Sequence, residues 1–130
     1  ITRSLAEMSR FAVSMGANPY TFLGLSGVGD LLVTCTSPLS RNYQLGLKIA
    51  QGQTFEEASD DLGKLAEGAN TLEQVFQKSK ELEVYMPLAH GLYQILFSNQ
   101  ETNLIFKALM ERQEESDVEF ADPTYWQGDP

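Results

Sequence analysis

The chain has 130 residues, 42% of them hydrophobic, and a net charge of −9 at pH 7. This length allows one modest hydrophobic core and is too short for two independent domains, and the hydrophobic fraction is too high for a disordered protein. The acidic charge provides no basic surface that could neutralise nucleic-acid phosphates, so nucleic acid is excluded as a partner. No hydrophobic segment reaches the roughly 18 residues of a membrane-spanning helix, so no membrane span is expected.

The acidic residues are distributed unevenly along the chain. Residues 1–112 contain all 9 Lys and Arg residues and 12 of the 18 acidic residues, whereas residues 113–130 contain the other 6 acidic residues and no basic one. We therefore expect a helical domain over residues 1–112 and a flexible acidic tail over residues 113–130. Tyr125 and Trp126 are unusual in such a tail. They either occur there by chance or dock onto a neighbouring surface.

The first hydrophobic pattern of the chain predicts a helix. Residues at steps of three and four positions fall on one helical face: Ile1, Leu5, Met8, Phe11 (or Ala12) and Met15. Gly16 is placed to end that helix. Because the pattern is already under way at the first residue, we expect the chain to be part of a longer protein.

A glycine-rich stretch follows this helix. Residues 19–25 are expected to form a short helix or turn, and Gly24, Gly27 and Gly29 are expected to interrupt regular structure. The glycine spacing resembles a dinucleotide-binding fingerprint only superficially, because no strand precedes it. The hydrophobic run at residues 31–33 is too short for its periodicity to distinguish a helix from a strand. We expect it to be helical, because the segments around it are predicted to be helical.

Two further helices follow in the middle of the chain. Residues 40–51 are predicted to form a helix with Leu45 and Ile49 facing inward. Thr54 and Glu57 have the spacing of a capping box, in which each side chain accepts from the other residue's amide. This capping box predicts the start of a short acidic helix.

Three longer helices complete the prediction. Asn70 is expected to cap a helix over residues 70–83, Pro87 to begin the next, and Thr102 to cap the last. The residues expected to face inward share helical spacing: Leu72, Val75, Phe76, Leu82, Leu88, Leu92, Ile95, Leu96, Ile105 and Leu109. No segment reads convincingly as a strand, so the predicted fold class is all-α, a single domain of about six to seven helices.

Asp30 is the first candidate for a functional residue. One interpretation is that its carboxylate caps the helix that follows, since aspartate is favoured at helix starts. The other is that the carboxylate lies at the floor of a cleft, where it accepts a hydrogen bond from a substrate hydroxyl or orients a catalytic lysine. The two interpretations are compatible, because a capping carboxylate can spare one oxygen.

Ser40, Arg41 and Asn42 form a second candidate group, with the hydroxyl of Thr34 between them and Asp30. Arg41 lies at a predicted helix N-terminus, where the helix dipole disfavours a cation unless an anion is bound there. The alternative is that Ser40 only caps the helix and Arg41 is solvated. A carboxylate, hydroxyls and a guanidinium together suit a small phosphorylated polyol or ketone, so we expect an anion-binding cleft around residues 30–42.

The remaining polar residues carry weaker signals. Glu67 is either a solvated loop residue or an acceptor for a ribose hydroxyl, and His90, the single histidine, is expected to be exposed and not catalytic. Without a second histidine or a cysteine cluster, no metal site is expected. The single cysteine, Cys35, excludes an internal disulfide, fits a reducing compartment such as the cytoplasm, and is interpreted as a small buried thiol.

The amino-acid sequences of four segments resemble motifs of bacterial NAD(P)-dependent glycerol-3-phosphate dehydrogenases. These segments are residues 1–8, 24–37, 40–42 and 67–68, and their order and spacing agree with the family. The resemblance covers about residues 1–112 and corresponds to the helical, substrate-binding C-terminal domain, which is similar to that of 6-phosphogluconate dehydrogenase-type enzymes. It implies that the N-terminal Rossmann domain and the catalytic lysine are absent from this chain.

The resemblance also implies an activity and a set of roles. The family interconverts dihydroxyacetone phosphate and sn-glycerol 3-phosphate by hydride transfer with NAD or NADP, which supplies glycerol phosphate for phospholipid synthesis. Asp30 would help hold the absent lysine and the substrate hydroxyls, with Thr34 in the same pocket. Residues that would bind the substrate phosphate are Ser40, Arg41 and Asn42, and residues that would contact the cofactor are Arg41, Leu65 and Glu67. The implied partners are the substrate, the chain's own Rossmann domain and a second copy in a homodimer.

Two departures from the family and two alternatives remain. Tyr43 and Gln44 stand where the family usually has basic residues, which leaves the choice between NAD and NADP open, and the acidic tail is longer than expected. One alternative is a stand-alone helical interaction module with the tail as its working part. The other is the helical domain of a different hydroxyacid dehydrogenase. The amino-acid sequence of residues 34–42 argues against this second alternative. If the first assignment holds, this chain alone is expected to be catalytically inactive.

Overall fold

The computed structural model describes residues 1–63, 67–98 and 100–111, and every regular element in these ranges is a helix. The predicted all-α class is therefore confirmed. The elements are, in chain order, α1 (Thr2–Ser14), the 3₁₀ helix η1 (Pro19–Leu23), the π-helix η2 (Leu25–Gly29), α2 (Asp30–Thr36), α3 (Arg41–Ala50), α4 (Phe55–Asp61), α5 (Glu67–Glu81), α6 (Pro87–Phe97) and α7 (Thr102–Glu111). The predicted tail, residues 113–130, lies outside the described residues, so the domain division stays a prediction.

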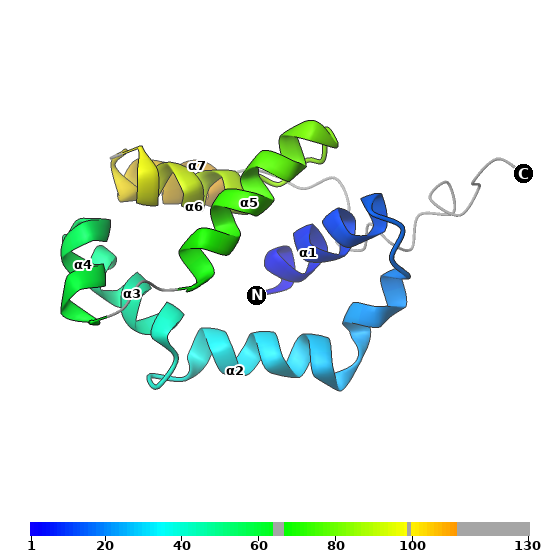
Figure 1. The fold of residues 1–130 in the computed structure, drawn as a ribbon, viewed down its shortest axis with the longest axis horizontal. Helices are drawn as coiled ribbons and strands as arrows, with labels where there is room; N and C mark the ends of the chain where they lie inside the picture. The colour runs from blue at the N-terminus through cyan, green and yellow to red at the C-terminus, as the bar shows by residue number, and fades with distance from the viewer. Residues whose placement is uncertain (64–66, 99, 112–130) are drawn as a thin grey trace, which may run out of the picture.

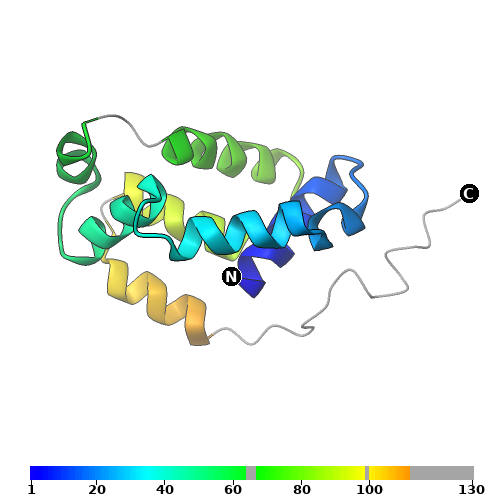
Figure 2. The ribbon, with the colours of Figure 1, turned by 90° about the horizontal axis from the view of Figure 1, so that it is seen from below.

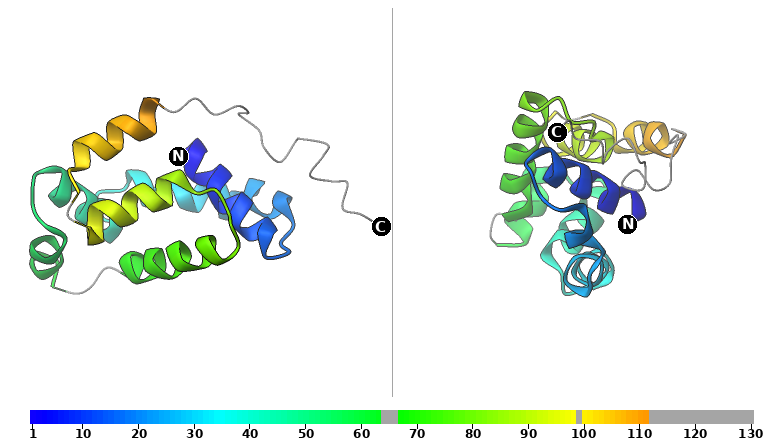
Figure 3. Two further views of the ribbon diagram at one scale, coloured as in Figure 1. Left: turned by 90° about the horizontal axis from the view of Figure 1, so that it is seen from above. Right: turned by 90° about the vertical axis from the view of Figure 1, so that its right-hand side faces the viewer.

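Helix α6 is the centre of the packing. It contacts α5, α7 and α1, and Figure 3 shows it lying between α5 and α7. Helix α2 runs along the opposite edge of the molecule and is joined to the rest through η2 at one end and α3 at the other (Figure 1). Helix α2 lies below the α5–α6–α7 layer in Figure 1 and in front of α6 in Figure 2, which is seen from below, so the edge that carries the glycine-rich stretch and α2 is separate from this layer.

The hydrophobic core consists of two linked clusters. Leu45 and Ala58 form the first, between α3 and α4, and Ala69, Leu72 and Leu96 form the second, between α5 and α6. Partly buried side chains of α3 and α4 pack against both clusters and so connect them: Ile49 and Phe55. Four positions that were predicted to face inward are therefore confirmed: Leu45, Ile49, Leu72 and Leu96.

Several helix starts agree with the local sequence signals. The capping box is present, with the Glu57 amide 3.2 Å from Thr54 Oγ1 and the Thr54 amide 2.9 Å from Glu57 Oε2. Pro87 is the first residue of α6. The prediction for Asn70 is wrong, because α5 begins three residues earlier, at Glu67, and Asn70 lies inside its first turns.

Helix α1 buries Ala12, one of the two residues predicted as alternatives, but otherwise a different face from the predicted one. Ile1 and Met15 are half exposed, whereas the carboxylate-bearing Glu7 is only 3% exposed. The Glu7 oxygens accept hydrogen bonds from the amides of Leu88 (2.6 Å) and Ala89 (3.1 Å) in the first turn of α6. Because α6 has no side-chain cap of its own, Glu7 provides one from the far end of the sequence. The need to satisfy these amides overrides the hydrophobic pattern of α1.

Four expectations about exposure are also wrong. Leu82, expected to face inward from α5, is 36% exposed, because it follows the last residue of that helix. Cys35 is exposed on α2, and Leu92 is 47% exposed because it lines an open cavity. His90 is partly buried, because α6 is covered on several sides and the position next to its predicted inward face meets α5. Within the described residues, no helix combines the length and hydrophobicity that crossing a membrane requires.

Candidate functional site

The glycine-rich stretch forms helical structure where an interruption was predicted. The π-helix η2 leads directly into α2, and Gly27 makes this possible. A Cβ atom at Gly27 would lie 2.5 Å from the backbone oxygen of Phe22, so only glycine allows η2 to approach η1 this closely. Single π-helical turns are often found at functional sites, which directs attention to the residue that follows, Asp30.

The interpretation of Asp30 as a helix N-cap is wrong. Gly29 (φ −65°, ψ −45°) and Asp30 (φ −64°, ψ −44°) both have helical backbone angles, so Asp30 lies inside a continuous helical segment. Its side chain is exposed, and within the described residues the carboxylate makes no hydrogen bond or ion pair. The carboxylate is therefore available to a group outside these residues.

Thr34 is the hydroxyl residue that shares a helix face with Asp30. It lies four positions later on α2 and is partly buried. The hydroxyl of Thr36, by contrast, donates to the backbone oxygen of Leu32 at 2.7 Å. Of these two threonines on α2, Thr34 is thus the one placed beside the carboxylate.

Ser40 and Arg41 make structural contacts at the start of α3. Ser40 Oγ accepts from the Tyr43 amide at 3.3 Å, which confirms it as the N-cap of α3. The guanidinium of Arg41 donates to the backbone oxygen of Leu62, the C-cap of α4, at 3.0 Å. A helix C-terminus favours a cation, so α4 offsets the unfavourable position of Arg41 at the N-terminus of α3.

Asn42 connects the candidate residues at the start of α3 with those at the start of α5. Its carboxamide lies against the backbone of Gly68, where a Cβ atom would be 2.7 Å from Asn42 Oδ1. Glu67, expected in a loop, is instead the exposed first residue of α5. The N-termini of α3 and α5 therefore lie side by side, and both present the positive ends of their dipoles to one region.

A cavity of about 280 Å³ opens beside this contact. Asn42, Gly68 and Thr102 line it together with hydrophobic side chains of α3, α5 and α6. Asp30 and Arg41 line neither this cavity nor the larger one described below. That these two residues face one shared cleft therefore stays a prediction, and Leu65 lies outside the described residues.

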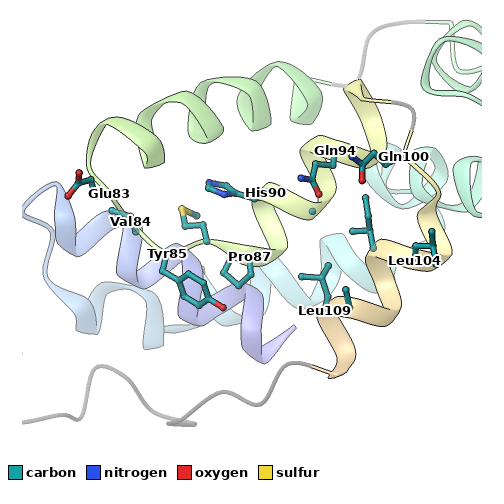
Figure 4. A pocket seen from close by; sticks show the side chains of 13 residues that line it. Glu83, Val84, Tyr85, Pro87, His90, Gln94, Gln100, Leu104 and Leu109 are labelled. Atoms are coloured by element: carbon teal, nitrogen blue, oxygen red, sulfur yellow. The ribbon is translucent and has the colours of Figure 1, made fainter.

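The larger cavity, of about 700 Å³, lies between α6, α7 and the segment that joins α5 to α6 (Figure 4). His90 lines it, and His90 Nε2 is 2.8 Å from Oγ of the fully buried Ser79. Burial, and secondly the Lys80 cation, lower the pKa of His90 below its ordinary value. No local sequence pattern predicts this pair, because the two residues lie on different helices.

Comparison with known proteins assigns the chain to a family. The family model described as NAD-dependent glycerol-3-phosphate dehydrogenase C-terminus matches residues 1–107. The chain belongs to this family. Its resemblance to glycerol-3-phosphate dehydrogenases, and the helical domain that this resemblance implies, are confirmed.

Individual relatives of the family agree. Glycerol-3-phosphate dehydrogenase [NAD(P)+] of Alcanivorax borkumensis is 58% identical over 120 residues, covering 92% of this chain and 35% of the relative. The Acinetobacter baumannii enzyme is 57% identical over 123 residues, covering 95% of this chain and 34% of the relative. The chain spans about a third of the length of these relatives.

A solved family structure supports the fold. The crystal structure of glycerol-3-phosphate dehydrogenase from Coxiella burnetii superposes with a TM-score of 0.82 at 34% identity, covering 85% of this chain and 34% of that one. Within the described residues, no three histidine, cysteine or acidic side chains come together as metal ligands. The candidate residues lie at the ends of α2, α3 and α5, and their role as a site stays a prediction.

Proposed function

We propose that this chain is the C-terminal, substrate-binding part of a glycerol-3-phosphate dehydrogenase that interconverts dihydroxyacetone phosphate and sn-glycerol 3-phosphate with NAD or NADP. The observation that carries the proposal is the contact between Asn42 and Gly68. It joins two segments 26 positions apart, each of which the family resemblance assigns to the site. The stand-alone interaction module, by contrast, gives no reason for this contact.

The start of α3 suits the substrate phosphate. Arg41 brings a guanidinium, Asn42 brings an exposed carboxamide, and the dipole of α3 favours an anion at this end. The neighbouring N-terminus of α5 adds to the same positive potential. We propose that Ser40 contributes indirectly, because its hydroxyl fixes the first turn of α3.

Asp30 suits the reacting end of the substrate. Its exposed carboxylate accepts hydrogen bonds from the substrate hydroxyls and from the ammonium group of a lysine in the remainder of the protein, and Thr34 lies beside it. This holds the lysine where it exchanges a proton with the substrate oxygen. The nicotinamide, when bound, supplies or accepts the hydride.

Glu67 and Arg41 suit the nucleotide. Glu67 is exposed at the N-terminus of α5, where its carboxylate can accept hydrogen bonds from ribose hydroxyls. Arg41 directly precedes Asn42, whose carboxamide lies against Gly68, and we propose that its guanidinium serves phosphate groups of both substrate and cofactor. Leu65 completes this set in the proposal. The residues present on the chain therefore fit a nicotinamide dinucleotide held mainly by another domain.

Replacing Arg41 tests the proposal in the full-length enzyme. Arg41→Ala is expected to raise the KM for dihydroxyacetone phosphate roughly 10- to 100-fold, the cost of a lost charge-assisted contact. Lys48→Ala is the matched control, because Lys48 is also on α3 but pairs with Asp61 at 2.9 Å. Equal KM values for the two variants would contradict the assignment of the phosphate site.

The proposal extends to location and assembly. An exposed free thiol, Cys35, is in keeping with the reducing cytoplasm. Leu104, Phe106 and Met110 leave a hydrophobic face of α7 exposed, which suits coverage by the remainder of the protein or by a second copy in a homodimer. Light scattering on the full-length protein, with Phe106→Glu beside the parent, tests the homodimer.

A further inference from the structure

Gly68 occupies a position where glycine has no conformational advantage. It is the second residue of α5, and its backbone does not adopt a positive φ. Alanine is preferred to glycine inside a helix, so the backbone alone does not explain this residue. The explanation has to come from what a side chain at this position would meet.

The three heavy atoms nearest to a side chain at Gly68 would all belong to one neighbour. Its Cβ atom would lie 2.7 Å from Oδ1, 3.1 Å from Nδ2 and 3.2 Å from Cγ of Asn42. All three atoms belong to the carboxamide at the end of a short, exposed side chain. A methyl group here would therefore turn the carboxamide away and leave the backbones of α3 and α5 in place.

We propose that Gly68 is a positioning residue for the substrate phosphate. Its missing side chain lets the start of α5 hold the Asn42 carboxamide in the orientation in which Nδ2 donates to the phosphate beside Arg41. This inference rests on the proposed function. It adds the residue that sets the geometry of one donor, and it assigns Gly68 no contact with substrate.

A double-mutant cycle in the full-length enzyme tests the inference. Asn42→Ala and Gly68→Ala are each expected to raise the KM for dihydroxyacetone phosphate about tenfold, the cost of one lost hydrogen bond to a charged group, with kcat within about twofold. The double variant is expected to be no worse than either single one, because the same contact is lost. The KM for the nicotinamide is the internal reference and should not change.

Gly46 provides the matched control. It also lies inside a helix, α3, but a Cβ atom there would meet nothing within 4 Å. Gly46→Ala should leave all kinetic constants unchanged and raise the melting temperature, since alanine favours the helix. Gly68→Ala should raise the melting temperature more in the Asn42→Ala background than in the parent, because only the parent has a carboxamide to displace.

The outcomes separate this inference from the proposed function. If Asn42→Ala raises the KM and Gly68→Ala does not, or if the two effects add, the positioning role of Gly68 is overturned while the phosphate site stands. If neither Arg41→Ala nor Asn42→Ala changes the KM, both proposals fail. Non-additive effects on the KM, together with the background-dependent melting temperature, support the positioning role.

Discussion

Two carboxylates of this chain, those of Glu7 and Asp30, show how differently the same group can be used. Glu7 is buried, and both of its oxygens accept amide hydrogens at the start of α6. Asp30 is exposed, lies inside a helical segment, and within the described residues makes no hydrogen bond or ion pair. The comparison separates a carboxylate that holds the fold together from one that the fold leaves available for chemistry.

The largest expected effect is on activity, at Asp30. In the full-length enzyme, Asp30→Asn keeps the shape of the side chain and removes the charge that is proposed to hold the lysine. We expect kcat/KM to fall roughly 10²- to 10³-fold, the range for disturbing a general acid–base group. Because the parent carboxylate has no partner among the described residues, the melting temperature should not change.

Asp60→Asn is the control for this prediction, since Asp60 is an exposed acidic residue on α4, away from α2. It should leave both activity and melting temperature unchanged. If Asp30→Asn instead lowers the melting temperature together with kcat/KM, the loss of activity reflects lost stability. Asp30 would then be a structural carboxylate, as Glu7 is.

Glu7 should show the opposite behaviour, with a somewhat smaller effect. Glu7→Ala leaves two amides at the start of α6 without their acceptor in a buried place, which costs about 2–4 kcal/mol of unfolding free energy. Urea denaturation of the full-length protein measures this loss. Glu7→Gln, which keeps one acceptor oxygen, should lose less than Glu7→Ala, and equal losses would show that packing, not capping, is the role of Glu7.

The same contrast explains which features could be predicted from the sequence. The capping box at Thr54 and Glu57, the cap at Ser40 and the start of α6 at Pro87 depend on residues within three positions of each other, so local spacing was sufficient. The Glu7 contact spans 81 positions, and no local pattern announces it. Long-range capping thus explains why the predicted hydrophobic face of α1 was wrong.

The candidate site divides in the same way. The family resemblance predicts Asp30 and Asn42 as site residues, because they lie in segments whose sequences are distinctive for the family. What it did not provide was the π-helix before Asp30 and the contact between Asn42 and Gly68, which depend on close backbone approaches between separate elements. Glycine positions reveal such approaches only when the neighbouring element is known.

The smallest expected effect concerns a partly buried group, His90, that lies on α6. Burial and the Lys80 cation lower the pKa of His90 from its ordinary value of 6.5. Below pH 6.5 the imidazole of His90 is therefore protonated in the unfolded chain while it is still largely neutral in the folded chain. The stability contributed by neutral His90 is fully present above this pH and is lost as the pH falls toward the lowered pKa.

Urea denaturation of the full-length protein and of His90→Gln at pH 7.5 and at pH 5.5 measures this contribution. The parent should lose more stability than His90→Gln between the two values, because glutamine does not titrate and its amide can still donate to Ser79 Oγ, whose own hydroxyl donates to the Phe76 carbonyl. Asp61→Asn is the control: hydrogen bonds from Lys48 and Gln53 lower the pKa of Asp61 below 3.8, so its contribution is lost only at more acidic pH. Equal losses in the parent and in His90→Gln would show that His90 titrates alike in the folded and unfolded chains, which would contradict the prediction.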